Sequence, residues 1–278
     1  MFKGVEAAMK KTTAVIILCI FSVLGCASGY KIFRILHEYR DGENSYEELN
    51  KYALPPLIDN NSDNAGNDGN DGTDNDDNGS DNTDNEDTAS GRTSVDFEKL
   101  RDINADTAAW VRIDGLAIDY PIVHGEDNEY YLTHLFNKEQ NGAGCIFLDY
   151  RNAADFSDRN SVIYGHNMKN GSMFSELGAY KSQSFRDEHR SFGLFTPQGN
   201  YVIEIFAGYT TDSQDRAWDT EFDDDADFEE WIDERIQKSV FHSDSAPSPY
   251  DKILTLSTCS YEFDNAKFVL FGIIRENN

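Results

Sequence analysis

The chain is poor in cysteine and in basic residues. Its 278 residues include four Cys, and 24 Lys and Arg stand against 51 Asp and Glu, which gives a formal net charge of −27. Cys19 and Cys26 fall in an apolar N-terminal segment, so the two remaining cysteines cannot form a disulfide framework. The chain also lacks the clustered Lys and Arg that phosphate binding needs, which argues against nucleic acid as a partner.

The sequence also lacks His, Cys and acidic residues at the spacing that metal sites need. None of the six His pairs with Cys or carboxylates at a spacing typical of zinc, and the sequence predicts no metal site and no cofactor. Within the acidic stretch 59–92, residues 74–79 match the first half of an EF-hand loop, but the twelfth position is Asn85 rather than Glu, and no helix flanks it. Because 59–91 has no aromatic or branched aliphatic residue, we interpret the stretch as a disordered, charge-extended linker.

The N-terminal segment 12–30 has no charged residue. As a helix, its 19 residues span roughly 28 Å, close to the hydrocarbon thickness of a bilayer. A cleaved lipoprotein signal ending at Cys26 is the alternative. Because 30–39 continues the helical pattern, we favour an uncleaved anchor. We expect 1–40 to be a membrane anchor helix with a short cytoplasmic tail, and 41–58 to be a juxtamembrane helical segment.

Residues 93–278 have a globular pattern of many short strands. A short helix is predicted at 97–103 behind a Thr93/Ser94 cap, and a longer amphipathic helix is predicted at 225–240. Asp114-Gly115 predicts a hairpin turn between the first two strands. The predicted strands are 110–113, 118–123, 144–150, 161–164, 201–209, 252–257 and 267–274. Short strands separated by turn residues are typical of a barrel or a sandwich.

One Cys and one His are each predicted to lie at the end of a strand. His166 follows a β-branched run and a Gly, and Cys259 ends the strand predicted near 252–257, just before the turn-forming Asp264-Asn265. A Cys with a His partner is the arrangement that thiol nucleophiles need. Cys145 lies within a predicted strand and is interpreted as a small buried hydrophobe. A Cys145–Cys259 disulfide, which would silence the nucleophile, remains an open alternative.

Five segments resemble the signatures of class B sortases, which are membrane-anchored cysteine transpeptidases of Gram-positive surfaces. The resemblance covers roughly residues 93–274 in consistent order, although the acidic linker is not part of the family pattern. It implies a mainly β fold, namely an eight-stranded closed β-barrel with N-terminal helices and one long helix before the last two strands. The matching segments are DNEYYL (127–132), IFLDYRN (146–152), YGHNM (164–168), GSMF (171–174) and TLSTC (255–259).

The resemblance also implies a reaction. Cys259 attacks the Thr carbonyl of a C-terminal sorting motif, and an amine of a peptidoglycan precursor or a pilin resolves the thioacyl intermediate. His166 protonates the leaving amine and deprotonates the incoming one. The catalytic domain, 93–278, would then face the outside of the cell membrane. The resemblance implies a substrate groove formed by Asn128, Leu132, Tyr164, Asn167, Ser257 and Thr258.

The sequence departs from the family at the third catalytic position. Family members have Arg eight residues after the Cys, and this chain has Lys267, which keeps the charge but loses the planar fork that donates two parallel hydrogen bonds. Arg275 lies roughly 26 Å further along the strand and cannot substitute. We expect an active enzyme that uses Lys267. A cysteine peptidase that only hydrolyses cell-wall peptides and a non-catalytic surface-binding module are the alternatives.

Overall fold

The computed structural model describes the backbone of residues 2–54 and 94–277, and the side chains of 21–53 and 95–277. The predicted linker at 59–92 lies outside the described residues. So do the side chains of 12–20, the first half of the predicted membrane segment. Within the part that is described, no helix is both long enough and apolar enough to span a membrane.

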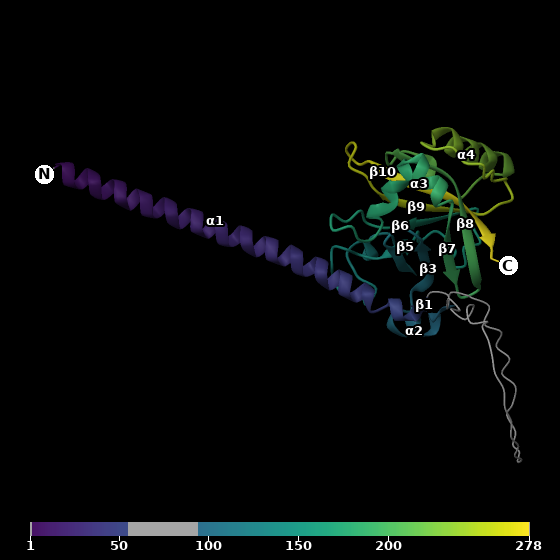
Figure 1. Ribbon diagram of the computed structural model, residues 1–278, viewed down its shortest axis with the longest axis horizontal. Helices are drawn as coiled ribbons and strands as arrows, with labels where there is room; N and C mark the ends of the chain where they lie inside the picture. The colour runs from purple at the N-terminus through teal and green to yellow at the C-terminus, as the bar shows by residue number, and fades with distance from the viewer. Residues whose placement is uncertain (1, 55–93, 278) are drawn as a thin grey trace, which may run out of the picture.

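Eight strands close into a barrel in the order β10-β8-β7-β3-β4-β5-β6-β9 (Figure 1). This confirms the barrel rather than the sandwich that the strand pattern alone also allowed. The strands of the barrel are β3 (Thr107–Ile113), β4 (Ile118–His124), β5 (Ile146–Leu148), β6 (Asn160–Tyr164), β7 (Ser191–Thr196), β8 (Gly199–Thr211), β9 (Ile253–Cys259) and β10 (Lys267–Glu276).

The predicted hairpin and all seven predicted strands are present. Gly115 has a φ of 84° in the turn between β3 and β4, a conformation that glycine adopts without steric cost. The strand that the pattern missed is β7, which pairs with β3 and β8. Its sequence, SFGLFT, has a Gly among its apolar residues and begins with an exposed Ser, so it lacks the regular alternation that marks a strand.

Helices cover the barrel at two places. α4 (Asp225–Lys238) precedes β9, as predicted, and buries Phe228, Trp231 and Ile232 in a second apolar cluster outside the barrel. The predicted cap of the short helix α2 (Phe97–Ile103) was wrong, because Ser94 lies in a strand and Asp96 accepts the hydrogen bond from the Lys99 amide at 3.0 Å. The remaining helices are α3 (Gln183–Glu188), η1 (Asn50–Tyr52), η2 (Tyr130–Leu132), η3 (Ser175–Lys181) and η4 (Arg216–Trp218).

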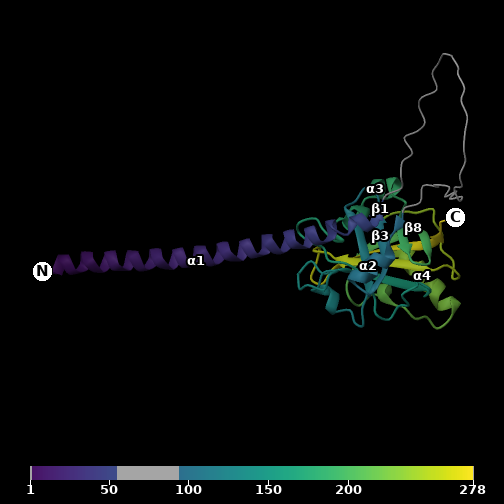
Figure 2. The ribbon, with the colours of Figure 1, turned by 90° about the horizontal axis from the view of Figure 1, so that it is seen from below.

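The N-terminal helix, α1 (Phe2–Glu47), extends away from the barrel as a long rod (Figures 1 and 2). The residues at and after its end belong to the folded body. Tyr46, Leu49 and Ala53 are buried in the main core, and the Tyr46 hydroxyl donates to the Gly144 carbonyl at 2.6 Å. The core therefore includes residues that precede the expected domain start at 93.

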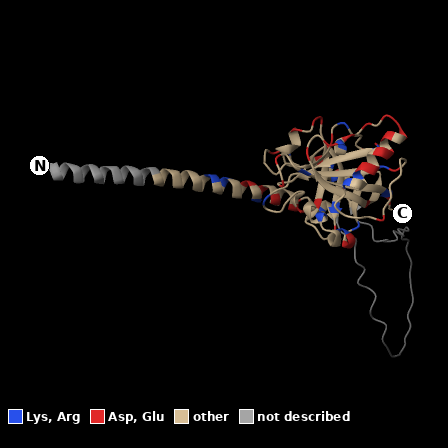
Figure 3. Cartoon of the chain, turned by 90° about the horizontal axis from the view of Figure 1, so that it is seen from above, with Lys and Arg blue, Asp and Glu red and all other residues tan. Residues whose placement is uncertain are grey.

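A two-stranded sheet joins the segments that precede and follow residues 55–93, which lie outside the described part of the chain. β1 (Ala53–Leu54) pairs antiparallel with β2 (Ser94–Val95), so Leu54 lies opposite Ser94. The described body carries much acidic charge, with Asp and Glu along α4 and basic residues interspersed over the barrel (Figure 3).

Candidate active site

Two neighbouring parallel strands bring the predicted thiol and imidazole to one rim of the barrel. β6 and β9 are paired so that Tyr164 lies opposite Ser257. His166 and Cys259 each follow two residues later, and parallel strands end at the same edge of a sheet. The register of these strands therefore places both side chains at the same end of the barrel.

His166 lies in a tightly closed loop. The preceding Gly165 has no room for a side chain, because a Cβ there would come within 2.5 Å of the Ile146 Cδ1 atom. The loop returns through an isolated bridge between Asn167 and Met173, and the Phe174 amide donates to the His166 carbonyl at 2.9 Å. These contacts fix the backbone of the loop that carries the imidazole.

Three hydrogen bonds connect the His166 loop to the strand and hairpin that carry Cys259. The Gly165 amide donates to the Ser257 carbonyl at 3.1 Å, and the Asn167 side-chain amide donates to the Cys259 carbonyl at 2.8 Å. The Tyr261 hydroxyl, in the hairpin after β9, donates to the Asn167 carbonyl at 3.0 Å. The relative position of His166 and Cys259 is thus fixed by backbone and amide contacts rather than by a direct hydrogen bond between the two side chains.

Lys267 lies directly beside the thiol. It is the residue opposite Cys259 in the β9–β10 ladder, and its Nζ atom donates to Cys259 Sγ at 3.0 Å. Arg275, at the other end of β10, pairs with Glu204 and Asp251 instead. The cation at this site is therefore a lysine, as the sequence analysis expected.

The His166 ring has a defined tautomer. Its Nε2 atom lies 2.7 Å from the Leu132 carbonyl oxygen. A carbonyl oxygen only accepts, so Nε2 carries the hydrogen. In the neutral ring, Nδ1 is then the nitrogen that can accept a proton.

These groups line a cavity of about 410 Å³. Of the predicted groove residues, Asn128, Leu132, Tyr164, Ser257 and Thr258 line it, whereas Asn167 is not in its lining and bonds the Cys259 carbonyl. Four further lining residues were not predicted from the sequence, namely Phe147, Gly165, Ser213 and Trp218. Of these, Trp218 could have been suspected, because it is the one Trp in the polar stretch 212–224.

A buried carboxylate supports the wall of this cavity. Asp149 is fully buried, accepts a hydrogen bond from the Tyr164 hydroxyl at 2.8 Å, and accepts two from the Arg151 guanidinium at 2.9 and 2.8 Å. Burial alone would raise the pKa of Asp149, but the bonds from Arg151 and Tyr164 hold it below its usual value. Tyr164 is in turn kept protonated, since burial and the adjacent carboxylate raise its pKa. The carboxylate thus orients the tyrosine toward the cavity.

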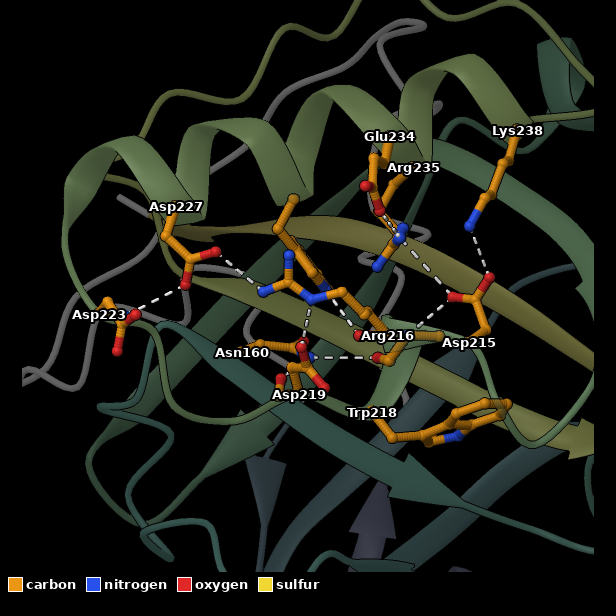
Figure 4. A network of polar contacts seen from close by, with 12 residues as sticks. Asn160, Asp215, Arg216, Trp218, Asp219, Asp223, Asp227, Glu234, Arg235 and Lys238 are labelled. Atoms are coloured by element: carbon orange, nitrogen blue, oxygen red, sulfur yellow. Dashed lines mark hydrogen bonds and ion pairs between the residues drawn. The ribbon is translucent and has the colours of Figure 1, made fainter.

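The segment between β8 and α4 places Trp218 over the same cavity. The Trp218 indole donates to the Ser257 hydroxyl at 3.0 Å, and Arg151 donates to the Trp218 carbonyl at 2.9 Å. Around it, Arg216 binds Asp219 and Asp227 at 2.7 and 2.9 Å (Figure 4). Ion pairs therefore hold a loop of polar sequence in a defined position beside the thiol.

The second thiol of the folded body is not a nucleophile. Cys145 is buried, its Sγ atom lies 3.2 Å from the Tyr46 hydroxyl oxygen, and its pKa is raised to about 12 by burial. Cys145 and Cys259 are both free, so the alternative of a disulfide between them was wrong. Within the described residues, no group of three or more His, Cys, Asp or Glu is placed to hold a metal ion.

A thiol, an imidazole and an amine at one rim of a closed barrel are the groups that a thiol-dependent acyl-transfer enzyme uses. The sortase domain family matches residues 111–272. Sortase B of Listeria monocytogenes is 42% identical over 178 residues, which are 64% of this chain and 72% of that protein. The chain therefore belongs to the sortase family, as a cysteine transpeptidase of the sortase B type.

Solved sortase B structures share the fold. A Staphylococcus aureus sortase B–substrate complex is 33% identical with a TM-score of 0.63, and the match covers 66% of this chain and 85% of that one. A sortase B complexed with triglycine is 33% identical with a TM-score of 0.62, and the match covers 66% and 86%. The N-terminal helices and the long helix before the last two strands agree with the expected sortase architecture.

Proposed function

We propose that Cys259, His166 and Lys267 are the catalytic residues of this transpeptidase. The observation that carries the proposal is the 3.0 Å contact from Lys267 Nζ to Cys259 Sγ, inside a cavity that His166 also lines. A positive charge beside a thiol favours the thiolate, which is the nucleophilic form. The same ammonium is positioned to donate to the oxyanion that forms when the thiolate attacks a carbonyl.

The reaction then runs in two acyl transfers. The Cys259 thiolate attacks the carbonyl of a Thr in the sorting motif, and His166 protonates the leaving amine as the peptide bond breaks. An incoming amine attacks the thioester, loses a proton to His166, and displaces the Cys259 thiolate. The Nε2–H bond to the Leu132 carbonyl orients the ring so that Nδ1 is the atom that carries these protons.

The sorting peptide binds along the cavity wall in this proposal. Asn128, Leu132, Tyr164, Ser257 and Thr258 supply its lining. Asn167 would act indirectly, through its bond to the Cys259 carbonyl. The acceptor is an amine of a peptidoglycan precursor or a pilin, which is consistent with the sortase B that is complexed with triglycine.

We further propose that α1 anchors the enzyme to the cell membrane, with the catalytic domain outside. Support comes from the uncharged 12–30 segment and from large apolar side chains that α1 exposes. Isolated exposed apolar residues are normal on soluble proteins, but a run on one helix marks an interaction site. The exposed residues are Phe21, Val23, Leu24, Tyr30, Ile32, Phe33, Ile35 and Leu36.

A peptide-library assay tests the function. The full chain is incubated with a pool of labelled peptides that contain Thr, with and without triglycine, and the products are identified by mass spectrometry. We expect cleavage after Thr and a product joined to triglycine, with a smaller hydrolysis product when triglycine is omitted. Cleavage that gives only hydrolysis products, even in excess triglycine, would contradict transpeptidation. Cleavage that persists in Cys259→Ala would contradict the assignment of the nucleophile.

A further inference from the structure

The cation beside the thiol is itself an amine. Lys267 Nζ lies 3.0 Å from Cys259 Sγ, and the antiparallel register of β9 and β10 places the two residues directly opposite each other. Among the described residues that line the cavity, Lys267 is the only one with an amine side chain. An enzyme that transfers acyl groups from sulfur to nitrogen therefore holds a nitrogen nucleophile of its own in contact with the sulfur.

Nothing in the described part of the chain holds that amine in an ion pair. No carboxylate oxygen lies within 4.0 Å of Lys267 Nζ there, whereas the nearby Lys181 binds Glu262 at 2.8 Å and the Ser260 hydroxyl at 3.2 Å. A carboxylate partner stabilises the charged, non-nucleophilic form of an amine. Lys267 thus differs from Lys181 in having no carboxylate partner among the described residues, and a lysine amine, unlike an arginine guanidinium, can serve as a nucleophile in a protein.

We propose that Lys267 is an internal acyl acceptor and becomes acylated by the enzyme's own intermediate. In a Cys259 thioester, the carbonyl carbon is bonded to Sγ and therefore lies close to Nζ, so the two reacting groups are already held together. The neutral amine attacks this carbon, a C–N bond forms and the C–S bond breaks. The proton lost by nitrogen is taken up by the sulfur that leaves, and Cys259 is restored as a thiol.

The product is a stable amide on Lys267, and this proposal rests on the acylation of Cys259 proposed above. The amide removes the charge next to the thiol and places a peptide in the cavity, so the modified enzyme no longer turns over. External amines compete with Lys267 for the same thioester. The enzyme should therefore inactivate itself when acyl donor is present and acceptor amine is scarce.

Mass spectrometry of the full chain tests this. The probe is acetyl-Ala-Thr thiophenyl ester, an activated acyl donor that does not require the sorting motif to be known. Incubation at mildly alkaline pH without acceptor is followed by hydroxylamine, which cleaves thioesters but leaves amides intact. Acylation of Lys267 blocks tryptic cleavage there and yields the peptide 253–275, whose fragmentation locates the acyl group.

We expect a hydroxylamine-resistant acyl group on Lys267 in the wild type, reduced by about tenfold or more by Cys259→Ala. Triglycine at a concentration that saturates its binding site should also reduce this group. Lys267→Arg should retain the hydroxylamine-labile group on Cys259 and lose the resistant one. Lys181→Arg, the matched control, should acylate Lys267 like the wild type. A labile group on Cys259 without a resistant group on Lys267 overturns this inference and leaves the proposed function standing. Absence of any acyl group on Cys259 in the Lys267→Arg variant, together with absence of a group on Lys267 in the wild type, overturns both.

Discussion

At the scale of single residues, the proposed active site depends on the hydrogen bonds that the Lys267 side chain can donate. Lys267 Nζ offers one compact charge next to Cys259 Sγ, whereas an arginine would offer a planar fork with two parallel donors. A fork can hold both the thiolate and the developing oxyanion, and a single ammonium must divide its hydrogen bonds between them. In the proposed mechanism, the identity of this one cation therefore sets how strongly the transition state is stabilised.

Substituting Lys267 tests that role. A second hydrogen bond to developing charge contributes on the order of 1.5–3 kcal/mol, so Lys267→Arg should raise kcat/KM by about one to two decades. Lys267→Ala should lose at least as much, because Arg275 is committed to Glu204 and Asp251. Initial rates of peptide cleavage with saturating triglycine measure both. Equal rates within about twofold for Arg, Lys and Ala would show that no cation participates.

The two described thiols of the barrel should respond in opposite ways. Cys259→Ala should abolish turnover with a nearly unchanged Tm, since the thiol lies at a half-exposed strand end. Cys145→Ala should keep turnover but cost about 1–2 kcal/mol, because it opens a small cavity and removes the polar contact of Cys145 Sγ with the Tyr46 hydroxyl. Thermal melts and iodoacetamide labelling separate the cases. Labelling of Cys145 instead of Cys259 in the folded protein would contradict the assignment of Cys259 as the nucleophile.

At the scale of elements, the loop between β8 and α4 is held to the barrel by charge. Asp215 accepts from Lys238 at 2.7 Å and from the Tyr209 hydroxyl at 3.0 Å, and it lies 3.6 Å from the fully buried Arg235 (Figure 4). The same loop carries Trp218 over the active-site cavity. One buried carboxylate therefore connects the stability of this element to the shape of the substrate site.

Asp215→Asn should destabilise the protein. It removes one of the two carboxylates beside the buried Arg235, which keeps Glu234 at 2.6 Å, and it removes the negative charge that Lys238 contacts, so it should cost about 2 kcal/mol and lower Tm by about 4–8 °C. Calorimetric melts measure this loss. Asp233→Asn is the matched control, because it removes one charge from an exposed position on α4. Equal melting temperatures for the two variants would show that the loop does not depend on Asp215.

The contribution of Asp215 to stability should depend on pH. Burial alone would raise the pKa of Asp215, but Lys238 and Arg235 hold it below its usual value. A depressed pKa stabilises the folded state above the unfolded-state pKa of about 3.9, and this contribution is lost as the pH falls through the lower, folded-state pKa. The difference in the free energy of unfolding between the wild type and Asp215→Asn should be largest at neutral pH and should decrease below about pH 4. A difference that stays constant into acid would contradict the charge-pair explanation.

At the scale of the whole molecule, the acidic segment does not separate α1 from the barrel. β1 and β2 pair directly, with Leu54 opposite Ser94, and Tyr46, Leu49 and Ala53 are packed in the barrel's core. Because both ends of the segment are joined to the same body, its length does not change the distance from α1 to the barrel. We therefore propose that 59–92 is a linker inserted into a hairpin.

Replacing residues 55–93 by Asn-Gly should consequently leave Tm and transpeptidation unchanged. A two-residue turn suits the antiparallel pair that Leu54 and Ser94 form. By contrast, removing residues 1–92 should lower Tm, because it strips buried side chains worth about 1.5–3 kcal/mol for each large residue. Melting curves and peptide cleavage of the two variants give the comparison. Loss of cooperative melting in the Asn-Gly variant would mean that the segment contributes to the fold.

Much of this fold was predictable because its signals are local. The strands of TLSTC and YGHN, the turn at Gly115 and the helix α4 all follow from periodicity and turn residues that lie close together in the chain. β7 was missed because a Gly interrupts its alternation, and the cap of α2 was misassigned because Ser94 pairs with Leu54, 40 residues away by number. The errors fall where contacts between distant segments outweigh local preference.

The sequence by itself determined that one thiol, one imidazole and a lysine are the candidates for the catalytic site, since these follow from residue identity and flanking pattern. Only the tertiary structure decided how they meet. The parallel register of β6 and β9 brings His166 and Cys259 to one rim, and the Leu132 carbonyl selects the histidine tautomer. Trp218 joins the cavity only because ion pairs fold its polar loop over it. Pairings between residues so far apart in the chain depend on closure of the barrel, which no local pattern encodes.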